Sequence, residues 1–210
     1  MFNYIVLLFL ASCSFFIQDN DKPKIIKKHL APKCSRPRAV SDDVSRIMLH
    51  FCSIAPEEPN NPYDLDKILA LFENNGVSAH YIIHRNGQIY ELVGEDRVAY
   101  HAGKGKLPFS PYFENSLNAH SIGIEMTAIG SEKDMMMFMS KERYAQIDKK
   151  HLGFTEAQYE SLNWLLKDII SRYPAIKKDR QHIVGHEEYA PLRRTDPGEL
   201  FDWKKIGLEK

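Results

Sequence analysis

The chain has no excess of charge of either sign. Its 210 residues carry 28 Lys and Arg against 28 Asp and Glu, so no overall field attracts nucleic acid or steers a strongly charged partner. Cysteine is scarce, with three residues in all, and no internal repeat is visible. The length suits one domain with appendages, and that domain is large enough to bury a substantial core. Binding and chemistry must therefore reside in local sites, and nucleic acid is not an expected partner.

A long apolar run is also absent. The stretch from Tyr4 to Ala11 is shorter than the roughly 20 residues that span a bilayer, and it ends in small residues, as an export signal does. Leu10-Ala11-Ser12-Cys13 resembles the lipobox of bacterial lipoproteins, in which the cysteine becomes the lipidated N-terminus after cleavage. We therefore expect a signal peptide over residues 1–13, lipidation at Cys13, and a periplasmic protein anchored to the outer membrane. An ordinary cleaved signal or a short uncleaved anchor is the alternative.

The next segment is rich in lysine and lacks apolar periodicity. Residues 14–39 contain three prolines among polar and basic residues, which is typical of a flexible tether. The alternative is an ordered arm packed on the domain. If Cys13 is lipidated, Cys34 and Cys52 remain as an even pair, and an oxidising compartment permits a disulfide between them.

Residues 40–210 are predicted to form the main domain, and they alternate strand and helix patterns. Residues 46–52 form an apolar run that predicts a strand covered on both faces. Residues 80–84 and 88–93 flank Arg85-Asn86-Gly87, which indicates a hairpin because Asn-Gly tolerates the positive φ angles of a type I′ turn.

Two helices are predicted within the same region. Apolar residues recur at helical spacing over residues 65–72 and stop at Asn75-Gly76, where a left-handed cap is expected. Thr155 and Gln158 make a capping box for a second helix, which Pro174 ends. The patterns therefore predict an α/β domain in which helices flank a mixed central β-sheet.

Three side chains of the metal-ligand type stand out. His186 and Asp196 flank a short turn-rich segment near the C-terminus, and His50 lies on the predicted buried strand far upstream. Two imidazoles and one carboxylate leave one of the four zinc positions open, which is the arrangement that catalysis needs. The alternative for each histidine is a structural role in the core or in a loop, with its ring nitrogens hydrogen-bonded to protein groups.

Further short motifs accompany these three residues. In chain order the set is His50, Ser78-Ala79-His80-Tyr81, Asn86-Gly87, Tyr100-His101-Ala102-Gly103, Ile122-Gly123-Ile124-Glu125, Gly185-His186 and Thr195-Asp196-Pro197-Gly198. Together they resemble the zinc amidases of the N-acetylmuramoyl-L-alanine amidase type 2 family, which is related to phage lysozyme-amidase and the peptidoglycan recognition proteins. The resemblance implies Zn²⁺ as cofactor, held by His50, His186 and Asp196, and peptidoglycan or muropeptides as the partner.

Glu125 is the candidate for proton transfer. Alternation along residues 121–126 puts the three apolar side chains on one face and Glu125, with Gly123, on the other. A carboxylate in so apolar a strand is costly unless it meets a charge. The resemblance implies that it takes a proton from the attacking water and later passes one to the leaving amine. The alternative is an outward-facing charge on an exposed strand.

The resemblance adds two more residues to the site. Arg194 stands two positions before Asp196, where related catalytic amidases commonly carry lysine, and a guanidinium donates hydrogen bonds to a developing oxyanion without readily giving up its proton. Its expected role is therefore electrostatic. His101 is interpreted as a pocket residue that contacts substrate, with an ordinary structural histidine as the alternative. Cys52, on the same strand face as His50, is interpreted as packing and not as a ligand.

The predicted function is zinc-dependent hydrolysis of the amide bond between the lactyl group of N-acetylmuramic acid and L-alanine. One alternative is a peptidoglycan-binding module without catalysis, although such relatives typically lack a metal ligand and this chain has all three. Another is a zinc peptidase acting on stem peptides. It is disfavoured because His186-Glu187-Glu188-Tyr189-Ala190 has no second histidine to complete His-Glu-x-x-His.

Overall fold

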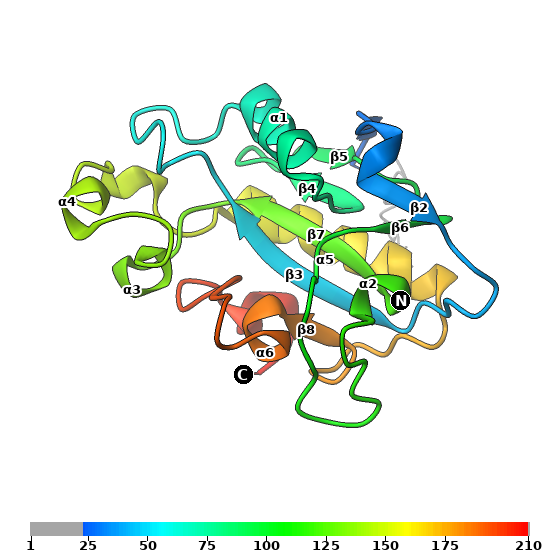
Figure 1. Cartoon of the computed structure of the whole chain (residues 1–210). Coiled ribbons are helices and arrows are strands. Elements are labelled where there is room, and N and C mark those ends of the chain that lie inside the picture. The colour runs from blue at the N-terminus through cyan, green and yellow to red at the C-terminus, as the bar shows by residue number, and fades with distance from the viewer. Residues whose placement is uncertain (1–22, 210) are drawn as a thin grey trace, which may run out of the picture.

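The central feature of the fold is a mixed sheet (Figure 1). A computed structural model describes residues 23–209, within which six strands form this sheet, in the order β1-β5-β4-β7-β3-β8, and β2 and β6 form a separate antiparallel pair. The strands are β1 Ile25–Lys27, β2 Ser35–Pro37, β3 Arg46–Cys52, β4 Tyr81–Ile83, β5 Ile89–Glu91, β6 Arg97–Ala99, β7 Ser121–Thr127 and β8 Ile183–Gly185. The prediction of an α/β domain with a mixed central sheet is confirmed.

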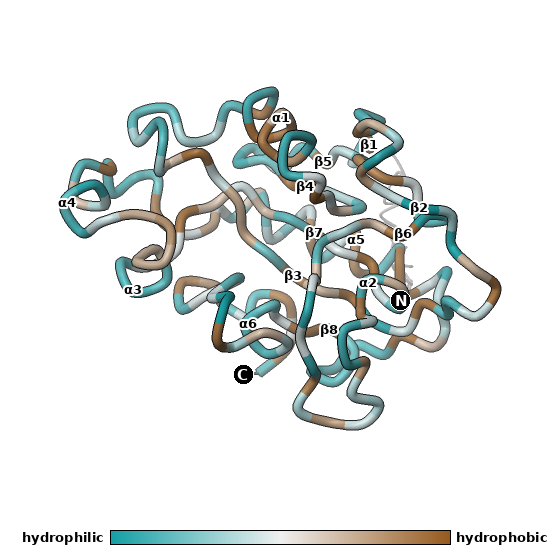
Figure 2. The backbone as a smooth tube through the Cα atoms, viewed as in Figure 1, coloured by the Kyte–Doolittle hydropathy of each residue, from teal (hydrophilic) through white to brown (hydrophobic). Residues whose placement is uncertain are grey.

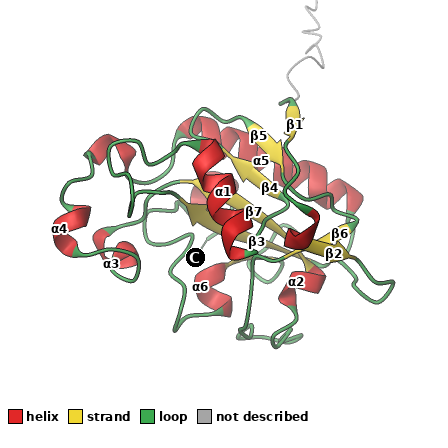
Figure 3. Ribbon diagram, turned by 45° about the horizontal axis from the view of Figure 1, so that its top comes forward, coloured by secondary structure: helices red, strands yellow, loops and turns green. Residues whose placement is uncertain are grey.

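Helices lie on both sides of the sheet (Figure 3). They are α1 Leu65–Asn75, α2 Leu117–His120, α3 Glu132–Met135, α4 Lys141–Tyr144, α5 Glu156–Arg172 and α6 His186–Tyr189, with 3₁₀ turns η1 Pro32–Cys34, η2 Lys149–His151 and η3 Trp203–Ile206. In the described part of the chain, no helix combines the length and the hydropathy needed to cross a membrane.

The longest helix, α5, begins and packs as its sequence dictates. The Thr155 side chain accepts from the Gln158 backbone N–H, and the Gln158 side-chain oxygen accepts from the Thr155 backbone N–H, which completes the predicted capping box. The apolar stripe of α5 is buried against β3, β7 and the C-terminal segment. Burial of each large aliphatic side chain of this kind contributes about 1.5–3 kcal/mol, so the stripe fixes α5 against one face of the sheet.

The opposite face of β3 carries the residues that lead to the site. Ile47 and Leu49 pack in the α5 core, whereas Met48 packs with Val184 and Tyr189 on the other side. Because side chains alternate along a strand, His50 shares the Met48 face. In Figure 2 the hydrophobic colour follows these central strands, while the outer loops are mainly hydrophilic. The buried strand therefore presents His50 on the face turned away from α5.

The predicted hairpin is present, but its turn differs from the expected type. β4 and β5 pair antiparallel, and the Gly87 N–H donates to the His84 carbonyl. Gly87 has φ 83°, while Asn86 is absent from the positive-φ residues between 23 and 209. A type I′ turn needs positive φ at both central positions. The loop instead has the pattern of a turn over Arg85 and Asn86 followed by a left-handed glycine, so the type I′ prediction is wrong.

The tether prediction for residues 14–39 needs correction where the structure describes it. β1 pairs in parallel with β5 at the sheet edge, and β2 pairs with β6. Between them, the Ala31 N–H donates to the Glu73 carboxylate. The local sequence does not indicate this order, because the residues that stabilise the arm lie far along the chain, on β5, β6 and α1. Residues 23–39 are thus the ordered arm that was the alternative, and the fold begins before residue 40.

Two other expectations concern the same region. Cys34 and Cys52 are free thiols, so the permitted disulfide is not formed. The predicted signal peptide, the lipidation site Cys13 and residues 14–22 of the predicted tether lie outside the described residues.

Candidate active site

Three elements bring the predicted ligands together from distant parts of the chain. His50 is near the end of β3, and His186 is the first residue of α6, directly after β8. Asp196 lies in the loop after α6, which is tied back to that helix because the Glu187 N–H donates to the Asp196 carbonyl over 2.8 Å. β3 and β8 are parallel neighbours, so their carboxyl ends meet at one edge and place both imidazoles there.

The donor atoms of these residues converge closely. His50 Nδ1 lies 3.1 Å from His186 Nδ1 and 2.7 Å from Asp196 Oδ2, and His186 Nδ1 lies 3.0 Å from the same oxygen. Tetrahedral zinc with bonds of about 2.0–2.2 Å separates its donors by about 3.3 Å. All three side chains are buried and form one potential metal-binding group. The residues therefore fit a zinc ion after a shift of a few tenths of an ångström.

Electrostatics favours the ligand forms of two of these side chains. Burial lowers the pKa of His50 to about 4, although the hydrogen bond that Asp196 accepts from the ring opposes the shift. Burial by itself raises the pKa of Asp196, but the interactions with His186 and His50 outweigh it and hold that pKa below its usual range. At neutral pH the site therefore presents a neutral imidazole at His50 and an ionised carboxylate, which are the states that bind metal.

Glu125 faces the same space from β7. It is the register partner of His50 in the parallel pair of β3 and β7, and it lines the same pocket. Burial, and then the Asp196 charge, raise the pKa of Glu125 to about 8, while a hydrogen bond with Cys52 opposes the shift. Within residues 23–209, its buried Oε2 has no hydrogen-bond partner. Such an unpaired carboxyl oxygen beside a polar pocket is suited to exchanging a proton with a bound reactant.

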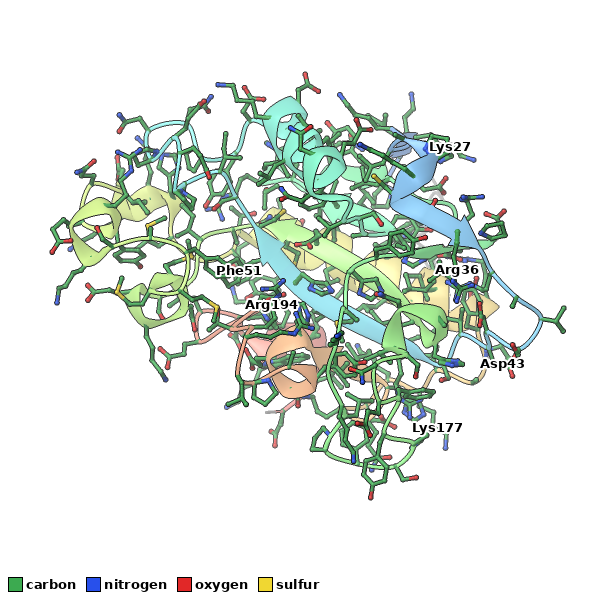
Figure 4. All side chains as sticks on the ribbon, in the orientation of Figure 1. Lys27, Arg36, Asp43, Phe51, Lys177 and Arg194 are labelled. Carbon is green, nitrogen blue, oxygen red and sulfur yellow. The ribbon has the colours of Figure 1, made fainter. Side chains whose placement is uncertain are left out.

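Arg194 is a further charged residue that lines the pocket, with His50, Glu125 and Asp196. Phe51, labelled next to it in the view of Figure 4, lines the same pocket. Its Nη1 donates to the Arg193 carbonyl over 3.1 Å. The position places a positive charge beside the candidate metal site.

The pocket around these groups has a volume of about 630 Å³ and two apolar walls. One wall comes from α1 and the following loop, with Leu71, Phe72 and Val77. The other comes from the segment after β7, with Met135 and Phe138. Phe138 keeps 41% of its surface exposed. The metal-ligand cluster thus lies in a pocket lined by apolar as well as charged side chains.

His101 and Cys52 also line this pocket, but their contacts were not foreseen. His101 Nδ1 lies 3.1 Å from His50 Nε2, and its Nε2 lies 3.2 Å from Ser121 Oγ. Burial lowers the pKa of His101 well below its usual range. Cys52 lies outside the potential metal-binding group and hydrogen-bonds Glu125. Sequence reasoning also missed Asn118 and Arg193, whose contacts to residues 101–104 follow no local pattern.

Comparisons with known proteins agree with this geometry. Residues 41–199 match the sequence profile described as N-acetylmuramoyl-L-alanine amidase. The 1,6-anhydro-N-acetylmuramyl-L-alanine amidase AmpD of Haemophilus influenzae is 32% identical over 202 residues, which cover 88% of this chain and 96% of that protein. The N-acetylmuramoyl-L-alanine amidase AmiD of Escherichia coli is 35% identical over 153 residues, covering 70% of this chain and 49% of that protein.

Two solved structures show the same fold. A selenomethionine derivative of AmpD superposes with a TM-score of 0.62 at 27% identity and covers 87% of this chain and 92% of that one. The complex of E. coli AmiD with the substrate anhydro-N-acetylmuramic acid-L-Ala-D-γ-Glu-L-Lys superposes with a TM-score of 0.56 at 31% identity, covering 81% of this chain and 60% of that one.

Proposed function

Because the chain belongs to the N-acetylmuramoyl-L-alanine amidase family, we propose that it is a zinc-dependent hydrolase of the amide bond between the lactyl group of N-acetylmuramic acid and L-alanine. The substrate class is peptidoglycan or muropeptides. The observation that supports the proposal most directly is the convergence of His50, His186 and Asp196 on one point beside Glu125. Three protein ligands and an adjacent carboxyl group are what hydrolytic zinc sites require.

The residues present divide the chemistry between them. When bound by His50, His186 and Asp196, zinc supplies Lewis-acid polarisation of the amide carbonyl and makes water a stronger acid. The positive charge of a bound metal would lower the pKa of Glu125 from its raised metal-free value. The ionised Glu125 accepts a proton from the attacking water and delivers one to the amine nitrogen as the carbon–nitrogen bond breaks. The products are the lactyl carboxylate and a peptide with a free N-terminal alanine.

Arg194 has a role that differs from the lysine common in related amidases. Its guanidinium donates hydrogen bonds to the carbonyl oxygen as negative charge develops there, and it keeps its own proton. Glu125 therefore carries both proton transfers. The pocket residues of α1 and of the segment after β7 offer apolar surface to the parts of the substrate next to the scissile bond.

A digest of defined muropeptides tests the proposal. The zinc-loaded protein is incubated with anhydro and reduced muropeptides, and the products are identified by mass spectrometry. Release of intact stem peptide with N-terminal alanine, lost on chelation and restored by zinc, is expected. Intact lactyl–alanine bonds in the presence of zinc would contradict it. Binding without cleavage would then favour a recognition module, and cuts inside the stem peptide would favour a peptidase.

Export and lipid anchoring form a separate part of the proposal. It rests on Leu10-Ala11-Ser12-Cys13 in the sequence, and it places the enzyme in the periplasm at the outer membrane. Metabolic labelling with a radioactive fatty acid should mark the wild type and not Cys13→Ala, with Cys34→Ala as the matched control. Equal labelling of the wild type and Cys13→Ala would rule the anchor out.

A further inference from the structure

Two adjacent residues contact both histidines of the candidate metal site. The side chain of His101 meets the far nitrogen of His50, with Nδ1 3.1 Å from Nε2. The backbone carbonyl of Ala102 meets the far nitrogen of His186, 2.9 Å from its Nε2. The His50 and His101 rings meet edge to face, with 83° between their planes. Each histidine therefore turns its Nδ1 toward Asp196 and its Nε2 toward the segment of residues 101–102.

The hydrogen bonds around this segment specify which nitrogen of each ring carries the proton. A carbonyl only accepts, so His186 donates from Nε2 to Ala102 and keeps a lone pair on Nδ1. Ser121 donates its hydroxyl proton to the Leu117 carbonyl over 2.6 Å, and its oxygen can therefore accept from His101 Nε2. A neutral His101 then has its lone pair on Nδ1.

The hydrogen bond between His101 and His50 in turn indicates which nitrogen of His50 carries the proton. With its lone pair on Nδ1, His101 accepts a hydrogen bond from the His50 Nε2–H, and a neutral His50 then has its lone pair on Nδ1. This nitrogen lies 2.7 Å from Asp196 Oδ2. A lone pair on either Nδ1 would repel the ionised Asp196 carboxylate at this distance unless a cation lies between them. The contacts on the Nε2 side of both rings therefore favour the tautomer that offers Nδ1 to a cation.

The segment itself is held firmly in place. Asn118 Oδ1 accepts from the backbone N–H groups of His101 and Ala102, over 2.9 and 2.7 Å. The Arg193 guanidinium donates to the carbonyls of Ala102 and Lys104 from the other side. Gly123 on β7 leaves room for the His101 ring, since a Cβ there would lie 2.5 Å from His101 Cγ.

We propose that His101, together with the Ala102 carbonyl, positions the metal ligands: it fixes the tautomers of His50 and His186 and acts through them, not through contact with substrate. This inference rests on the metal site of the proposed function. Groups that orient histidine ligands typically change metal affinity 10–100-fold when removed. His101 is then a positioning residue, and its loss acts first on zinc binding.

A matched pair of variants tests the His101 contact. His101→Asn keeps an acceptor near the place of Nδ1, whereas His101→Leu has nearly the same shape and no acceptor. Zinc affinity is measured by competition with a chromogenic chelator, and ligand geometry by the visible spectrum of the cobalt-loaded protein. We expect zinc to bind His101→Leu about 10–100-fold more weakly, with an altered cobalt spectrum, and His101→Asn to stay within a few-fold of wild type. His29→Leu, an exposed histidine on the arm, is the control.

Kinetics at saturating zinc separates positioning from substrate contact. For His101→Leu, added zinc should restore most of kcat with KM unchanged. Unaltered zinc affinity together with a raised KM would overturn the inference and make His101 a substrate contact. The wild type could bind zinc, and His101→Leu could weaken that binding as expected, while no muropeptide is cleaved. The proposed function would then fail and the positioning role would stand.

A second pair keeps the test decisive if His101→Leu does not fold. Asn118→Asp retains an oxygen that accepts from both backbone N–H groups, whereas Asn118→Leu does not. Asn118→Leu should weaken zinc binding and Asn118→Asp should not, with both metal-free proteins folded by circular dichroism. Equal zinc affinity of the folded pair would overturn the inference.

Discussion

Glu125 lies directly across from His50 in the parallel pair of β3 and β7. β3 and β7 are adjacent strands of the sheet, and residues paired across them share a face. The backbone hydrogen bonds between the strands therefore hold Glu125, the candidate base, next to His50, a candidate ligand. Neither depends on a flexible loop for its place. The separation of the candidate proton acceptor and the candidate ligand is thereby set by the sheet.

This arrangement predicts the effect of Glu125→Gln. The amide preserves the size of the side chain but cannot accept the proton of the attacking water, so kcat should fall by about 10²–10⁴-fold. Zinc affinity should change little, because Glu125 is not one of the converging donors. Steady-state kinetics and chelator competition measure the two quantities. Near-normal kcat in the variant would remove Glu125 from the mechanism.

The raised pKa of Glu125 predicts a pH-dependent difference in stability between the metal-free proteins. The folded state keeps the Glu125 proton up to about pH 8, whereas the unfolded chain releases it near the ordinary value of 4.5. Wild-type stability should therefore decline as pH rises through this window. Glu125→Gln lacks this decline, so its advantage over wild type should grow by roughly 3 kcal/mol between pH 5 and pH 8.

Urea denaturation of chelator-treated proteins at several pH values checks this. Comparing the variant with wild type cancels the contribution of titrating groups that do not interact with Glu125. Parallel stability curves across the window would show that the carboxyl is not held in its protonated form.

Arg194 should contribute through charge and hydrogen bonding. Arg194→Ala is expected to lower kcat by about 10²–10³-fold, the typical cost of losing one oxyanion donor, with a smaller change in KM. Arg194→Lys restores a cation and should recover most of the rate. The matched alanine and lysine variants are compared by initial rates on one muropeptide. Equal kcat for wild type and Arg194→Ala would show that the guanidinium is a bystander.

Metal removal should lower thermal stability through the three converging side chains. Zinc at about 1,000 times its Kd stabilises the folded state by about 4 kcal/mol, which corresponds to roughly 10 °C in Tm for a chain of this size. Asp196→Ala should abolish the zinc-dependent rise, whereas the exposed Asp66→Ala should keep it. Calorimetric scans with and without chelator measure both. A full zinc response in Asp196→Ala would place the metal elsewhere.

The sequence predicted features that depend on local chemistry. Thr155 with Gln158 defines a helix start within four residues, and Gly76, with φ 63°, ends α1 as expected. His50, His186 and Asp196 were identified by their residue types and motif context, and the structure brings all three together. Each of these signals is carried by a few neighbouring residues, so it can be recognised without the fold.

Other features depend on distant partners. The orientation of His101 depends on Ser121 and His50, on two different strands, and no spacing rule indicates which nitrogen faces which neighbour. The positions of Arg193 and Asn118 relative to residues 101–104 likewise follow only from the folded chain. The Asn86-Gly87 pair predicted the hairpin but not its turn, because Asn86 is compatible with more than one backbone conformation.

The ordered arm has a practical consequence for shortened versions of this protein. A chain cut at residue 40, where the motifs begin, would lose β1 and expose the outer edge of β5, whose unpaired backbone groups invite edge-to-edge association between molecules. It would also lose Arg38, which donates to carbonyls of Arg97 and Glu95. Truncation at residue 23 leaves that edge covered, so it should yield monodisperse material where the shorter version precipitates.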